Sequence, residues 1–257
     1  MNGLGILFDR QNALVKVGIV CIVAMGVLFG LSATIMKTVI SMKLFFLMVG
    51  FSSVAIVFYH IGKNNIFMNL LGLAVAFVVS AQWFLKPNWW IIDIIGICIV
   101  LQVLLGLPRI TLQNLIIIAI GFVLYDVIVV YFLNTMARVA GTAMSNELPM
   151  LIMIPRTFSF AETSNIFALG LGDVMLPALL IKEEFYRAKE YDFPKVLSIP
   201  LMPLVLGVGY VIGIAIAIIV AFTTRTGQPA LVFIIPAMFA CLGITYFIVG
   251  QRKSCLK

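Results

Sequence analysis

Apolar runs of about twenty residues follow one another along most of this sequence, and they constrain its fold more than any other feature. A helix of about 20 apolar residues spans the hydrocarbon core of a bilayer. The chain is 63% hydrophobic and 11% charged, whereas soluble domains are roughly 45–50% apolar and about 25% charged. The runs are continuous rather than alternating, which disfavours a β-barrel. The sequence therefore predicts an all-α polytopic membrane protein, with residues 1–257 forming a single transmembrane domain.

The apolar segments predict a bundle of eight transmembrane helices. Most connections are very short, so consecutive helices are expected to lie side by side and antiparallel. For the charged connection Lys182–Lys195 we expect a solvated loop or a helix extension. The predicted helices are Ala13–Met36, Leu44–Ile61, Ile66–Leu85, Trp89–Gly106, Leu112–Asn134, Asn165–Ile181, Val196–Phe222 and Pro229–Gly250.

The charged residues bear on topology and partners. Lys and Arg are more frequent on the side that carries both termini, which predicts that both termini are cytoplasmic. The net charge is +7. We expect the basic residues behind it to lie in loops beside the lipid bilayer, where they set the topology, and we expect no nucleic-acid partner. One histidine and four cysteines without CxxC spacing indicate no metal site. No cofactor is expected.

Two carboxylates lie deep within the predicted helices. Asp126 is eight residues before Asn134, and Asp173 is eight residues after Asn165, so each lies ~12 Å from the same membrane face. A charge at that depth is costly and is a functional hypothesis by default. Asp93, in contrast, lies near the start of its helix, where a carboxylate suits the helix dipole, and a structural role is expected for it.

The residues around Asp173 support a close approach of another chain. Gly170 and Gly172 each reduce helix stability by roughly 1 kcal/mol relative to Ala, but small residues let backbones come close together in membranes. Two carboxyl groups held close in a low dielectric share one proton. Such a pair can act as general base and general acid on a peptide bond. A proton-coupled transporter or a cation leak channel would use a deep Asp pair equally well.

Three short motifs in a fixed order separate these alternatives. Tyr125-Asp126 lies in one predicted helix, Gly170-Leu171-Gly172-Asp173 in the next, and Gln228-Pro229-Ala230-Leu231 opens the last. In this order they resemble the GxGD intramembrane aspartyl proteases, the presenilin and signal peptide peptidase family, over roughly Trp89 to the C-terminus. The Gln-Pro-Ala-Leu motif is closer to the signal peptide peptidase branch.

The resemblance implies a presenilin-like bundle and an aspartic-type endopeptidase that cleaves transmembrane helices. Asp126 and Asp173 would be the catalytic dyad, with Tyr125, Gly170, Leu171, Gly172, Gln228, Pro229, Ala230 and Leu231 in supporting or substrate-binding roles. Residues 107–257 would be the catalytic spans and residues 1–106 a scaffold. The family has nine spans, so a further first span would complete the match.

The resemblance also implies which molecules the protein interacts with. Single-span membrane proteins or signal-peptide remnants would be the substrates, and obligate partner subunits are not expected. The compact loops suit a microbial homologue in a cell membrane.

An apolar segment bracketed by prolines precedes the helix of Asp173. A short strand there could pair with an extended substrate, and the rival expectation is an interfacial loop resting on the bilayer. The segment comprises Pro149, Met150, Leu151, Ile152, Met153, Ile154 and Pro155.

Overall fold

The structure, a computed structural model, describes residues 39–62, 65–132, 136–155, 166–190, 195–196, 199–224 and 228–255. The chain divides into two compact units, residues 1–45 and 46–257. Nearly all described residues belong to the second unit, and the contacts given below are contacts within it. The first predicted helix, Ala13–Met36, lies outside the described residues.

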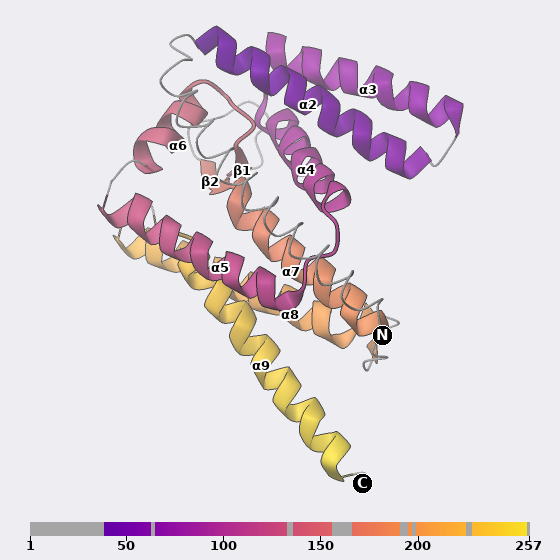
Figure 1. Ribbon diagram of the computed structural model, residues 1–257. Coiled ribbons are helices and arrows are strands. Elements are labelled where there is room, and N and C mark those ends of the chain that lie inside the picture. The colour runs from indigo at the N-terminus through magenta and orange to yellow at the C-terminus, as the bar shows by residue number, and fades with distance from the viewer. Residues whose placement is uncertain are drawn as a thin grey trace, which may run out of the picture. The chain divides into compact units, whose positions relative to one another are not determined.

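Helices make up most of the described chain (Figure 1). Five of them are long and apolar enough to cross a membrane, by length and composition. The all-α polytopic class is therefore confirmed, with four short strands added to it. The helices are α2 (Val39–Gly62), α3 (Ile66–Leu85), α4 (Trp89–Gly106), α5 (Leu112–Val127), α6 (Met136–Ser145), α7 (Leu171–Glu190), α8 (Leu201–Thr224) and α9 (Leu231–Cys255).

Two predicted helices, α3 and α4, agree with the structure at both ends because local signals define them. The side chain of Asn65 accepts a hydrogen bond from the backbone N–H of Phe67 and so caps the start of α3. Pro87 follows the end of α3, and a proline cannot continue the hydrogen-bond ladder of a helix. The helix after Gly106 begins at Leu112, also as predicted.

The predicted helix Leu112–Asn134 changes type near its end. Helix α5 stops at Val127, and a π-helical turn, η1 (Ile128–Phe132), follows directly. A π turn contains one more residue than an α turn and is a feature often found at functional sites.

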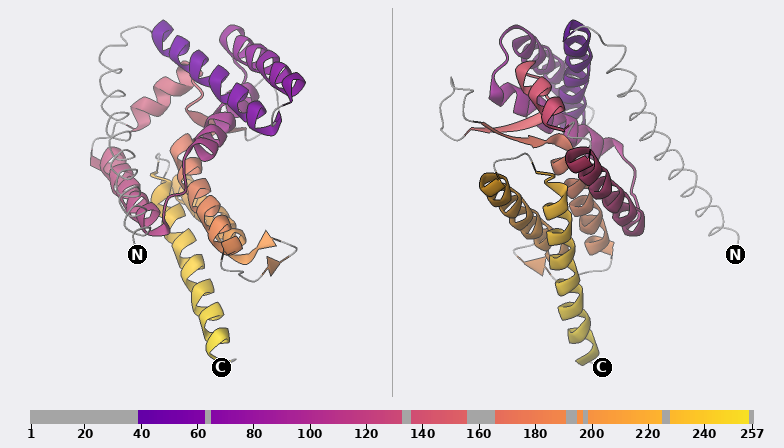
Figure 2. Two further views of the ribbon diagram at one scale, coloured as in Figure 1. Left: turned by 45° about the vertical axis from the view of Figure 1, so that its right-hand side comes forward. Right: turned by 90° about the vertical axis from the view of Figure 1, so that its left-hand side faces the viewer.

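A small antiparallel hairpin precedes α7. Strand β1 (Leu151–Pro155) pairs with β2 (Ile166–Gly170), and Figure 2 shows the pair leading into α7. The prediction of helix over Ile166–Gly170 is therefore wrong, because the backbone of these residues is bonded to β1 and α7 begins only at Leu171. The expected strand before Asp173 exists, and its proposed pairing with substrate stays a prediction.

The last two helices also begin later than predicted. Strands β3 (Lys195–Val196) and β4 (Ile199–Pro200) form a second antiparallel pair, so α8 starts at Leu201. Helix α9 starts at Leu231, since Pro229 and Ala230 belong to the turn that leads into it.

Helices α8 and α9 approach each other closely at two glycines of α8. A Cβ atom built on Gly209 would lie 2.7 Å from the Cα of Met238, and one built on Gly213 would lie 2.5 Å from the Cα of Ile234. Any side chain there would push the helices apart, as expected for small residues at membrane helix contacts. The buried core that surrounds this contact comprises Leu115, Ala119, Leu176, Leu180, Met202, Leu206, Leu231, Ile234, Ile235, Met238 and Leu242.

The charged connection Lys182–Lys195 is a helix extension over residues 182–190, which is one of the two forms expected for it, but the carboxylates of Glu183 and Glu184 are buried rather than solvated. Glu184 is fully buried, and Arg187 donates a hydrogen bond of 2.7 Å to its carboxylate. The hydroxyl of Tyr246, on α9, donates to the same carboxylate at 3.3 Å. Helix α7 therefore extends to Glu190 because its polar residues find partners on neighbouring elements.

The buried pair of Glu184 and Arg187 should matter for stability. Glu184→Ala removes the carboxylate that Arg187 and Tyr246 bind, and breaking a buried ion pair costs about 3–5 kcal/mol. Because Arg187 is 27% exposed, we expect a loss of about 3 kcal/mol in the free energy of unfolding, at the lower end of that range. Thermal unfolding of the purified protein in detergent measures it.

Glu190→Ala is the matched control on the same helix. Glu190 and its partner Arg109 are 57% and 48% exposed, and exposed ion pairs contribute about 0–1 kcal/mol. Equal losses for the two variants would contradict the role assigned to Glu184.

Candidate active site

Asp126 lies in the last turn of α5, immediately before the π turn. It is 7% exposed. The backbone N–H of Leu231, the first residue of α9, lies close to its carboxylate and acts on it electrostatically. The atom Oδ2 is buried and has no hydrogen-bond partner among the described residues. A buried carboxylate oxygen left in this way is costly unless a proton or a bound group satisfies it.

Asp173 lies in the first turn of α7, not several turns into a helix as the sequence predicts. Its Oδ2 accepts a hydrogen bond of 3.2 Å from the backbone N–H of Gly170, the last residue of β2. Because the first N–H groups of a helix have no partner within the helix, a carboxylate there is favourable. The equal-depth calculation therefore rested on a wrong helix start.

The two carboxyl groups nevertheless come together. Helices α5 and α7 contact each other, and the charge of Asp126 acts directly on the carboxyl group of Asp173. The structure thus brings both predicted acids within range of electrostatic interaction, on two neighbouring helices of an apolar bundle. Such a pair can hold one proton and one negative charge.

The glycines beside Asp173 differ in what surrounds them. A Cβ atom built on Gly170 would lie 3.1 Å from the Oδ2 of Asp173, so a side chain there would crowd the carboxylate. No atom lies within 4 Å of a Cβ built on Gly172, which leaves open space beside the acid. Leu171 lies between them and faces α4, where its Cδ2 is 3.1 Å from a Cβ built on Gly96.

The start of α9 lies close to Asp126, whereas the side chain of Tyr125 is exposed. Leu231 provides the N–H that acts on Asp126, and Pro229 is buried. The side chain of Tyr125 is 64% exposed and has no hydrogen bond with the described part of the chain. A supporting role for Tyr125 stays a prediction that the geometry does not favour.

Asp93 has a contact that its sequence context did not indicate. Its Oδ1 accepts a hydrogen bond of 2.7 Å from the backbone N–H of Met153, in the middle of β1. This contact joins α4 to the outer edge of β1, so that edge is already occupied at Met153. Only the position of the acid close to a helix start was visible in the sequence.

The outer edge of strand β2, in contrast, has no partner at Ala168 within the described part of the chain. Successive residues of an antiparallel pair point their backbone groups alternately toward and away from the partner strand. Leu171 N–H donates to Met150 O across the pair, whereas Gly170 N–H points to Asp173. Ala168, two residues before Gly170, must therefore also point its N–H and C=O outward, and no residue in the described ranges bonds to them.

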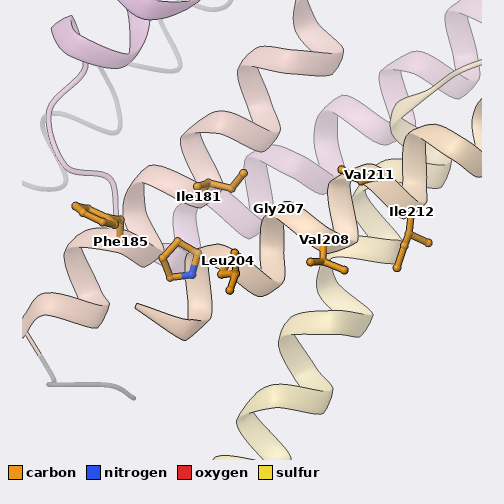
Figure 3. Close-up of a pocket in the computed structure, with 8 residues that line it drawn as sticks. Ile181, Phe185, Leu204, Gly207, Val208, Val211 and Ile212 are labelled. Atoms are coloured by element: carbon orange, nitrogen blue, oxygen red, sulfur yellow. The ribbon is translucent and has the colours of Figure 1, made fainter. Parts of the chain in front are cut away.

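A groove of about 540 Å³ lies elsewhere, between α7 and α8 (Figure 3). Its lining side chains are all apolar and include Ile181, Phe185 and Val208. Since the groove contains neither acid, it cannot supply acid–base chemistry. An apolar groove of this kind suits a surface that faces lipid.

Comparison with known proteins finds one matching family profile and several proteins of similar sequence. The sequence matches the profile of the signal peptide peptidase family over residues 3–254. It is 30% identical to human "Signal peptide peptidase-like 2A" over 216 residues, which cover 76% of this chain and 40% of the relative. It is 27% identical to human "Signal peptide peptidase" over 184 residues, 68% of this chain and 44% of the relative.

The rice protein "Signal peptide peptidase-like 3" (Oryza sativa subsp. japonica) is 28% identical over 186 residues, 65% of this chain and 33% of the relative. The chain thus spans less than half the length of each of these three relatives. The family match extends over nearly the whole sequence and agrees with the three motifs and with the apolar helices. This chain is an integral membrane protein that belongs to the signal peptide peptidase family.

Proposed function

We propose that this protein is an intramembrane aspartyl endopeptidase whose acid–base dyad is Asp126 and Asp173. The observation that carries the proposal is the pair of carboxyl groups, which lie in electrostatic range of each other on neighbouring apolar helices. Membership of the signal peptide peptidase family supports the same activity. No observation favours the transporter or channel alternative.

In the proposed reaction the two acids share the proton transfers. The ionised acid takes a proton from a water molecule, whose oxygen attacks the carbonyl carbon of the peptide bond. The neutral acid gives its proton to the carbonyl oxygen. In the second step the C–N bond breaks, and the departing amine receives a proton from the acid that gained one. A hydroxyl group of the hydrated carbonyl gives its proton to the other acid as the carboxyl product forms. Both acids then return to one proton between them.

The supporting groups hold the acids for this chemistry. Leu231 N–H orients Asp126, and Gly170 N–H orients Asp173, so each acid is fixed by a backbone group rather than by a mobile side chain. Fixing reacting groups in the required geometry lowers a barrier by several kcal/mol. The open space at Gly172 would admit the substrate backbone beside Asp173.

The substrate would be a membrane-spanning segment or a signal-peptide remnant, locally extended at the cleaved bond. A helical peptide bond is shielded by its own hydrogen bonds, so extension must precede attack. The outward edge of β2 at Ala168 offers the backbone groups that an extended substrate needs, and it leads directly to Asp173. This placement differs from the sequence prediction, which put the substrate against Pro149–Ile154, because Asp93 occupies the outer edge of β1 at Met153.

The proposed setting is a cell membrane, with both termini on the cytoplasmic side, as the distribution of Lys and Arg indicates. Activity without partner subunits is part of the proposal. Purified protein alone is therefore the right material for the experiments that follow.

The dyad is tested with Asp126→Asn and Asp173→Asn, which keep the size of each side chain but remove the acid. Purified protein in lipid vesicles is incubated with a single-span substrate, and the products are identified by mass spectrometry. We expect each variant to lose at least about a thousandfold in kcat, the scale seen when a member of a catalytic unit is removed. Glu190→Gln, an exposed carboxylate on α7, should retain activity. Proton flux that the variants abolish, with no cleavage by the wild type, would contradict the proposal.

The pH dependence of kcat/KM provides a separate test of the shared proton. At low pH both acids are protonated and no base remains, whereas at high pH both are ionised and no acid remains. We therefore expect a bell-shaped profile whose two limbs belong to the pair. A profile that is flat over several pH units would contradict a coupled dyad.

The role of the β2 edge is tested with Ala168→Pro, which removes one outward N–H. Proline is tolerated where the N–H of an edge strand faces outward, so the hairpin should remain. The loss of one main-chain hydrogen bond of about 1 kcal/mol should lower kcat/KM for a helical membrane substrate at least about fivefold. Ala168→Val keeps the N–H and is the control. Equal rates for the two variants would rule out substrate pairing at this edge.

A further inference from the structure

The π turn directly after Asp126 changes which face of α5 the following residues occupy. In a continuous α-helix a residue five positions after Asp126 would lie about 140° around the axis from it. In a π turn the hydrogen bonds join residues five positions apart, so such residues lie nearly above one another. The residue five positions after Asp126 is Tyr131, which lies within η1. The π turn therefore brings Tyr131 toward the same face as Asp126.

On that face Tyr131 contacts the segment that leads into α9. Its hydroxyl donates a hydrogen bond of 2.7 Å to Oε1 of Gln228. Nε2 of Gln228 donates in turn to Oγ1 of Thr224, the last residue of α8, at 2.9 Å. The amide of Gln228 is thus held at both ends, between the π turn and the end of α8.

The contact between Tyr131 and Gln228 lies close in sequence to the contact between Leu231 and Asp126. Gln228 precedes Leu231 by three residues, and the Leu231 N–H lies close to the Asp126 carboxylate and acts on it. The start of α9 is therefore tied to the end of α5 at two points, one at the acid and one at Tyr131. A shift of the Gln228 end would move the Leu231 N–H relative to the acid.

We propose that Tyr131 is a positioning residue: through Gln228 it holds the Pro229-Ala230-Leu231 segment so that the Leu231 N–H stays directed at Asp126. The inference rests on the proposed protease function and adds to it a residue outside the three motifs. It also gives the π turn a role, since an uninterrupted α-helix would turn Tyr131 away from Gln228.

The burial of Tyr131 favours positioning over a packing role. Its side chain is 52% exposed, so the ring contributes little buried area and little hydrophobic stabilisation. The polar contact that the structure gives Tyr131 is the hydrogen bond that its hydroxyl group donates to Gln228. Removing the hydroxyl while keeping the ring therefore isolates the proposed role.

The experiment compares Tyr131→Phe, Gln228→Leu and the double variant with the wild type in the vesicle cleavage assay. We expect Tyr131→Phe to lower kcat roughly five- to tenfold, as for loss of one well-placed hydrogen bond, with KM and the thermal midpoint unchanged. The double variant should be no slower than Gln228→Leu alone, because Tyr131 acts only through Gln228. Tyr59→Phe, which removes the hydroxyl of an exposed tyrosine on α2, should cleave at the wild-type rate.

A binding measurement gives a readout independent of turnover. A peptide inhibitor that carries a hydroxyl-bearing carbon in place of the cleaved carbonyl mimics the tetrahedral intermediate, and Tyr131→Phe should weaken its affinity by about the same factor as kcat. Wild-type rates for Tyr131→Phe, or independent, multiplying effects in the double variant, would overturn the inference while the protease function stands. A wild type that cleaves no substrate would overturn the proposed function and with it this role.

Discussion

The electrostatic proximity of the carboxyl groups of Asp126 and Asp173 is the constraint to which the surrounding elements conform. Each acid is costly to bury in an apolar bundle, and the chain offsets that cost with backbone N–H groups rather than with cations. One N–H comes from Leu231 and the other from Gly170. Both are groups that a helix or a strand leaves without an internal partner: the first N–H of α9 and an outward N–H of β2. The helix start and the strand end are thereby placed where the acids are.

This arrangement explains why a β-hairpin occurs in a helical membrane protein. Non-helical backbone at membrane depth is tolerated only where it is buried in protein or lines a polar cavity. Strands β1 and β2 satisfy each other along one edge, Asp93 satisfies Met153 on the outer edge of β1, and Asp173 satisfies Gly170 on the outer edge of β2. Among the described residues the outward groups of Ala168 have no partner, and Ala168 is two residues before Gly170, whose N–H binds Asp173. A backbone edge of this kind is a costly feature in an apolar environment, which is why we assign it to an extended substrate.

Local signals allowed much of the helical fold to be predicted. Helices α3 and α4 were predicted to the residue because Asn65 and Pro87 mark their limits. The start of α7 was predicted too early because Ile166–Gly170 forms a strand with Leu151–Pro155. No local sequence pattern shows that these two segments pair. The burial of Glu184 was missed for a similar reason, since its partner Tyr246 lies 62 residues away.

The two acids predicted to lie close together are in electrostatic range of each other, although α7 begins at Leu171 rather than near Asn165; their role as a catalytic pair stays a prediction. The same apolar context that made each acid conspicuous in the sequence is what brings the helices into contact. The π turn and Asp93 could not be found in this way. No local pattern marks the π turn, whose Tyr131 bonds to Gln228, 97 residues further along the chain, and the partner of Asp93 is a backbone group.

Helix α9 shows how the parts act together. Near its start it meets Asp126 through Leu231, and fifteen residues later Tyr246 meets the buried Glu184 of α7, a separation of about 22 Å along the helix axis. Between these points Gly209 and Gly213 press α8 directly onto its backbone. Helix α9 is thus held near its start, at Tyr246 and along its contact with α8, so a rotation would break a buried hydrogen bond or open a close-packed contact, each of which costs at least about 1 kcal/mol. The position of the Leu231 N–H beside Asp126 therefore depends on the whole of α9, and we propose that the hydroxyl group of Tyr131 adjusts it through the turn at Gln228.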